Sequence, residues 1–131
     1  MNFFIRKGAI LPLLRMKVIE DSNLDYQKFM TMLENSAITF SMRELNTGAY
    51  KIANRQGGIV LRKKRVNNAQ QDEYYIYYKW QSKDTNKVGE FQGEFHIDFF
   101  GSETGNLIVP TQENLIIHVG DSFTKTTITS V

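Results

Sequence analysis

The fold of this chain is decided by the stretch Phe91-Gln92-Gly93-Glu94-Phe95-His96-Ile97-Asp98-Phe99. Apolar or small residues alternate with polar ones along its whole length. Since successive side chains of a β-strand point to opposite faces of a sheet, this alternation predicts a strand with one buried and one solvated face. Residues 74–80, Tyr-Tyr-Ile-Tyr-Tyr-Lys-Trp, repeat the period of two and predict a second such strand.

Shorter strand-like stretches surround these two, at residues 38–42, 49–52, 59–61, 107–109 and 115–119. Residues typical of turns separate them. Short strands with turns every 8–12 residues or so favour an all-β antiparallel sandwich, here of about seven to nine strands. A length of 131 residues suits one domain over residues 1–131 with one core. The residues expected in that core are Phe40, Tyr78, Trp80, Phe95 and Ile97.

One short helix or turn region is expected near residues 24–34. Asp21-Ser22-Asn23 supplies groups that cap a helix N-terminus. Four apolar residues follow at the spacing i, i+3, i+4 and i+7, which puts them on one helix face. They are Tyr26, Phe29, Met30 and Leu33. With about three turns, the helix depends on docking that face onto the rest of the fold.

The N-terminal stretch, residues 3–19, is expected to be extended and to break at Pro12. Proline has no N–H to donate to a sheet, and it drives the preceding Leu11 toward the β region. The sequence therefore predicts an edge strand or a strand that changes partner at Pro12.

Composition and charge exclude several classes of protein. Hydrophobic residues make up 41% of the chain and charged residues 23%, which is an ordinary globular balance. The net charge of +2 is too small to indicate a nucleic-acid or membrane partner. The chain has no cysteine, which excludes disulfides, thiolate metal sites and a cysteine nucleophile. The longest apolar run, residues 9–14, is far shorter than the roughly 20 residues of a membrane span. Because no signal-peptide pattern is present, we expect a chain that begins near Met1 and is not exported.

Catalytic and metal-binding patterns are scarce. His96 and His118 each fall on the polar face of a predicted strand. A zinc site would need them on adjacent strands beside Glu94 or Asp98; we interpret them instead as solvated strand-face residues. Phosphate-binding loops, a serine elbow and a complete calcium loop are all missing from the sequence. We therefore predict a protein without catalytic residues, metal or cofactor.

The most conspicuous polar feature is the basic run Arg62-Lys63-Lys64-Arg65. Between residues 51 and 65 there are six basic residues and no acidic one. One interpretation is a patch for phosphate, an anionic glycan or an acidic protein partner. The other is a solvated hairpin arm whose charges discourage edge-to-edge aggregation. Similarly, Tyr75 and Tyr77 could stack on a sugar, or could simply pack across strands.

A resemblance to a known family lies in two segments, Tyr78-Lys79-Trp80-Gln81-Ser82-Lys83-Asp84-Thr85 and Gly89-Glu90-Phe91-Gln92-Gly93-Glu94-Phe95-His96-Ile97-Asp98-Phe99. They resemble the immunoglobulin-like domain of tailed-phage baseplate upper proteins and related virion proteins. The early strand at 38–42 and the closing strands at 107–119 are similar as well. Ala9 stands where that family usually has Asp, and the basic stretch at 51–65 is longer than expected.

The resemblance implies an immunoglobulin-like antiparallel sandwich and a non-enzymatic virion structural protein of the tail, baseplate or head-accessory class. It would be made in the host bacterial cytoplasm and located in the virion. We expect partners among other virion proteins, in a homo-oligomer or in many copies, and neither a membrane span nor nucleic acid. The alternative is a host-surface glycan-binding module of a phage adhesin, which would use Tyr75, Tyr77 and the basic run.

The assembly surfaces are expected at the two ends of the chain and at the basic run. Possible extended arms lie at residues 1–8 and 120–131, because both ends are strand-prone without an assured partner strand. Deleting residues 1–5 or 122–131 is expected to leave a folded domain that no longer assembles. The other reading is that both ends are simply frayed. The candidate interface residues are Phe3, Phe4, Ile5, Arg62, Lys63, Lys64, Arg65, Phe123 and Ile128.

Overall fold

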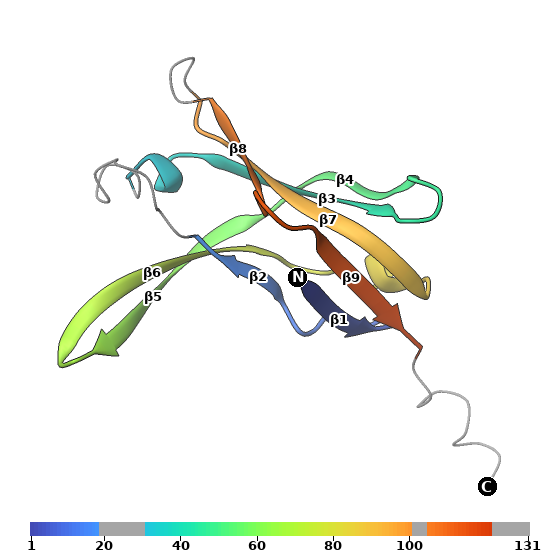
Figure 1. Ribbon diagram of the computed structural model, residues 1–131, viewed down its shortest axis with the longest axis horizontal. Coiled ribbons are helices and arrows are strands. Elements are labelled where there is room, and N and C mark those ends of the chain that lie inside the picture. The colour runs from blue at the N-terminus through green and yellow to red at the C-terminus, as the bar shows by residue number, and fades with distance from the viewer. Residues whose placement is uncertain (19–30, 101–104, 122–131) are drawn as a thin grey trace, which may run out of the picture.

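The chain folds into two β-sheets that face each other (Figure 1). The computed structural model describes residues 1–18, 31–100 and 105–121. No helix in these residues is long and apolar enough to cross a membrane. The elements are β1 (Asn2–Arg6), β2 (Leu14–Lys17), β3 (Ala37–Glu44), β4 (Tyr50–Gln56), β5 (Gly58–Val66), β6 (Ala69–Tyr78), the 3-10 helix η1 (Ser82–Thr85), β7 (Gly89–Asp98), β8 (Asn106–Val109) and β9 (Leu115–Gly120).

The larger sheet has the order β1-β9-β7-β3-β4, with β8 also paired to β7. The strand predicted most clearly, β7, lies at its centre and pairs with β3 along its length. On its other side β9 pairs with one half of β7 and β8 pairs with the other half. Pro110 follows directly after β8. All of these pairs are antiparallel, but β1 pairs with β9 in parallel. Strand β1 is the parallel exception in the predicted antiparallel sandwich. It is not joined to β9 by a hairpin, so it can enter the sheet from the same end as β9.

The smaller sheet has the order β2-β6-β5. Strands β5 and β6 form a long hairpin whose far end projects beyond the rest of the sandwich (Figure 1). Its turn is Asn67-Asn68, with both φ angles positive, at 52° and 64°. Asparagine tolerates this left-handed conformation, which two-residue hairpin turns require.

The topology confirms the predicted fold class. The order β9-β7-β3-β4 in one sheet and β2-β6-β5 in the other corresponds to strands G-F-C-C′ and B-E-D of variable-type immunoglobulin domains. The predicted break at Pro12 is also confirmed as a change of partner. The chain leaves the larger sheet after β1, passes Pro12 and joins the smaller sheet as β2.

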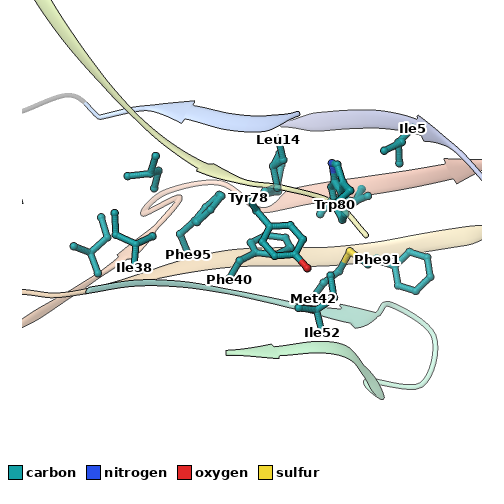
Figure 2. Packing of buried hydrophobic residues seen from close by; sticks show 14 of the residues in the cluster. Ile5, Leu14, Ile38, Phe40, Met42, Ile52, Tyr78, Trp80, Phe91 and Phe95 are labelled. Carbon is teal, nitrogen blue, oxygen red and sulfur yellow. The ribbon is translucent and has the colours of Figure 1, made fainter. Parts of the chain in front are cut away.

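The core lies between the inner faces of the two sheets (Figure 2). Phe40 is fully buried, and its ring contacts the rings of Tyr78, Phe95 and Trp80 at centroid distances of 4.8, 4.9 and 5.9 Å. Gly93 leaves room for this cluster, because a Cβ there would come within 2.8 Å of Phe40. All five residues expected in the core are buried.

The expected helix is described only at its end. Residues 31–34 are helical and Leu33 is fully buried, as the predicted apolar face requires. The capping residues at 21–23 and the other three residues of that face, Tyr26, Phe29 and Met30, lie outside the described residues.

A buried polar cluster fixes η1 against the core. The Asp84 side chain is 1% exposed and accepts hydrogen bonds from the Tyr78 hydroxyl (2.7 Å), Arg55 Nη1 (3.1 Å) and the Gln81 N–H (2.8 Å). A buried carboxylate needs such partners, and here they come from three separate segments. Thr85 next to it donates to the Ala9 carbonyl and so ties the N-terminal segment to the same place.

Alkaline pH should reveal the Tyr78–Asp84 bond. Burial and the neighbouring Asp84 carboxylate raise the pKa of Tyr78 above its usual value of 10.0. The folded state therefore keeps this proton where the unfolded state loses it, so the contribution to stability is complete below pH 10 and falls as the pH rises above it. We expect urea midpoints of wild type to drop above pH 10 by more than those of Tyr78→Phe. Equal alkaline slopes for the two proteins would contradict this.

Candidate interaction surface

Strand β1 forms one edge of the larger sheet and has β9 as its single strand partner among the described residues. The Met1 carbonyl accepts from Ile116, and Lys7 donates to the Gly120 carbonyl. In a parallel ladder alternate residues bond to the partner strand, so odd-numbered residues face β9. The N–H and C=O groups of Asn2 and Phe4 consequently point outward, where another strand could pair with them.

The side chain of Phe4 stands on the outer face of this edge and is 68% exposed. Its ring stacks on His118 of β9, with centroids 4.6 Å apart and planes 14° from parallel. The His118 ring is itself hydrogen-bonded through Nε2 to Asn2 Oδ1 at 2.9 Å. Phe4 is therefore held in place by its neighbours while most of its surface remains in water.

An open groove of about 650 Å³ runs beside β1. Its walls include Phe4, Leu11, Pro12 and Val88. Leu11 is 70% exposed and Val88 47% exposed, so the apolar surface extends from β1 across the groove. Contiguous apolar surface on a folded domain is typical of an interaction site.

The structure separates the three apolar residues that were expected to act together at the N-terminus. Phe4 is exposed, but Ile5 is a core residue with 3% exposure, and the half-buried Phe3 stacks on Trp80 at 5.8 Å. Alternation along β1 sends Phe3 and Ile5 to the inner face. The assignment of Ile5 to an interface is therefore corrected, and residues 1–8 are not a loose arm, since residues 2–6 form a paired strand.

The basic run lies on β5 in the projecting half of the hairpin. In the strand register Arg62 is opposite Glu73 and Lys63 is opposite Asp72, both acidic. Lys64 and Arg65 are opposite glutamines. The run is thus paired with residues 70–73 of β6, whereas Tyr75 and Tyr77 are opposite Val60 and Gly58. Phe123 and Ile128 lie outside the described residues, so their place in an interface stays a prediction.

The two tyrosines considered for sugar binding are half-buried and engaged with their neighbours. Tyr75 carries the Arg15 guanidinium 5.5 Å from its ring centre and donates its hydroxyl proton to Glu73 at 2.8 Å. The Tyr77 ring lies against Gly58, where an added Cβ would be 2.5 Å away. These contacts are cross-strand packing of the kind that stabilises a sheet.

The histidines occupy different parts of the outer face. His96 lies 2.9 Å from Glu94 on its own strand, and His118 lies under Phe4. Within residues 1–18, 31–100 and 105–121, no group of three or more side chains has the composition of a metal site.

Sequence reasoning found Phe4 but missed its companions in the groove. Leu11 belongs to an apolar run before a proline, and Val88 is a single apolar residue in a polar loop. No alternation around Leu11 or Val88 predicts that its side chain is exposed. The loops that contain these two residues come together only in the folded chain, where β1 pairs with β9. His118 was recognised as a face residue, and its stacking partner could not be read from its own strand.

No known family, characterised protein or solved structure matches the chain significantly.

Proposed function

We propose that this chain is a non-enzymatic structural protein of a bacteriophage virion, in the tail, baseplate or head-accessory class, that works through protein–protein contacts. It would be located in the particle, in several copies, after synthesis in the cytoplasm of the bacterial host. The observation that carries the proposal is the ordered apolar surface along the open edge of β1.

The resemblance in residues 78–99 supports the virion class. In the structure this segment supplies much of the interior: Tyr78 and Trp80 enter from one sheet, and Phe91 and Phe95 from the other. The Asp-Thr pair in its loop is the buried Asp84-Thr85 of η1. The residues that carry the resemblance are therefore those that a scaffold of this kind needs, and they have no chemical task of their own.

The edge of β1 supports a role in assembly. The exposed Phe4 ring lies on β1, and the exposed Leu11 lines the same groove. Apolar side chains next to an open strand edge are the combination that allows one sheet to be extended by another chain. Folded proteins usually protect such an edge. An unprotected edge in this chain therefore favours a partner protein that covers it.

Quantitative mass spectrometry of purified particles tests the proposal. The chain should be found in banded particles, at several copies per particle, after washes that remove proteins adhering from the lysate. Its presence in the lysate together with its absence from washed particles would contradict the proposal.

A glycan array examines the alternative function. The isolated wild-type chain is expected to show no saturable binding to any sugar, because Arg15 and Gly58 already occupy the neighbourhood of Tyr75 and Tyr77. Saturable binding that is lost in Tyr77→Ala would favour an adhesin module instead.

A further inference from the structure

Five strands of the described sheets have an open side, and they differ in how well that side is protected. Strand β8 has four residues and ends at Val109, directly before Pro110. Strand β2 has four residues, and its outward Arg15 and Lys17 are both cationic. Strand β5 carries the run at 62–65. If either strand paired with a second copy of itself, cations would face cations. On β4, Asn54 has a φ of 50° and the pairing with β3 shifts register, which is the irregularity of a β-bulge.

The remaining edge, β1, has none of these features. Its register with β9 is regular over all five residues, and its one charged residue is Arg6. Arg6 Nη1 donates to the Asp121 carbonyl of its own chain at 2.9 Å. The amino terminus beyond Asn2 is likewise paired, with Glu113 at 3.3 Å. The edge therefore combines open backbone groups and exposed apolar side chains with cations that already have partners.

We propose that β1 is the contact between two copies of this chain, with their β1 strands antiparallel about a two-fold axis at Phe4. The inference rests on the proposed assembly function and adds the identity of one partner. Centring on Phe4 places Asn2 of each copy opposite Arg6 of the other, so within residues 2–6 no like charges are opposite each other. Lys7 comes opposite Met1, whose ammonium group is already paired with Glu113. A second copy presents the same length of edge and the same outward residues, as a two-fold interface requires.

The expected contact can be described residue by residue. The N–H and C=O groups of Phe4 face outward, so the two Phe4 residues exchange both of their hydrogen bonds across the axis. Their rings lie side by side on the outer face, each supported by its own His118. A strand added here also runs along the groove and covers part of its apolar wall at Leu11.

The first test compares Phe4→Glu with Tyr50→Glu by sedimentation velocity over a wide range of protein concentration. Tyr50 is the matched control, because it is also 68% exposed and lies on β4, the opposite edge of the same sheet. Wild type and Tyr50→Glu should form dimers with similar dissociation constants. In Phe4→Glu the constant should rise by about 30-fold or more, the usual effect of removing an aromatic hot spot. An unchanged constant in Phe4→Glu overturns the inference.

Cysteine pairing tests the axis itself, and the chain has no cysteine to interfere. Opposed residues of a hydrogen-bonded antiparallel pair lie about 5.5 Å apart, within reach of a disulfide. Under mild oxidation Phe4→Cys should form a disulfide-linked dimer, and a mixture of Asn2→Cys with Arg6→Cys should form one that neither forms alone. Tyr50→Cys should stay monomeric.

Outcomes of this test separate the inference from the proposed function. Crosslinking of Phe4→Cys no faster than that of Tyr50→Cys, with wild type monomeric throughout, overturns the β1 contact. The proposed function would still stand if mass spectrometry finds the chain in particles. Conversely, if the chain dimerises through β1 but is absent from particles, the β1 contact is supported and the proposed virion role is contradicted.

Discussion

A chain that lacks residues 1–5 is expected to lose at least about 5 kcal/mol of stability, in place of the folded domain that the sequence alone predicts for this deletion. The deletion removes Ile5 from the core and Phe3 from the face of Trp80. Loss of one buried aliphatic side chain costs about 2–5 kcal/mol, and each ladder hydrogen bond to β9 adds roughly 1 kcal/mol. Domains of this kind are stable by only about 5–15 kcal/mol, so urea unfolding followed by circular dichroism should show a large fall of the midpoint or no folded baseline.

The matched control for this deletion is Phe4→Ala in the full-length chain. Phe4 lies within the deleted segment but is exposed, so this variant should keep a midpoint close to that of wild type. A deletion variant that unfolds cooperatively at the wild-type midpoint would mean that β1 is a dispensable arm and that its pairing with β9 adds nothing.

The substitution Phe40→Ala is expected to cost about 3–5 kcal/mol. Phe40 is fully buried at the centre of the aromatic cluster, in contact with the rings of Tyr78, Phe95 and Trp80. Removing its ring leaves a cavity between two sheets whose strands are fixed by their ladders, so little collapse can compensate. Denaturant titration measures the loss, with Trp80 fluorescence as a second probe because Trp80 borders the cavity.

Phe100→Ala is the comparison for this core substitution. The Phe100 side chain is 69% exposed, and its removal should change the free energy of unfolding by less than about 0.5 kcal/mol. Similar costs for the two substitutions would contradict the placement of the core between the sheets.

The strands that sequence predicted best are those with one wet and one dry face. In residues 74–80 and 91–97 every second residue is buried, so the local alternation of the sequence is enough to predict these strands. The Asn-Asn turn was predictable for a similar reason, because a two-residue hairpin needs residues that accept positive φ.

The pairing of β1 could not be predicted in the same way. Its partner β9 lies more than 100 residues later in the chain, and the parallel direction follows from the path that residues 7–13 take to the smaller sheet. The alternation of Asn2, Phe4 and Arg6 places Phe4 outward and Ile5 inward only once residues 2–6 are known to form a paired strand. Phe4 is exposed, so its place in an interface stays a prediction, whereas Ile5 belongs to the core.

The most direct test of the assembly role is to count the chain in particles made by a phage that lacks the gene and receives it in trans. Wild type and Tyr50→Glu should be incorporated at the same copy number, measured by mass spectrometry of washed particles, and Phe4→Glu should be strongly depleted although it is folded and equally abundant in the lysate. Equal incorporation of Phe4→Glu would contradict assembly through the β1 edge, and absence of the wild-type chain from the particles would contradict the virion role itself.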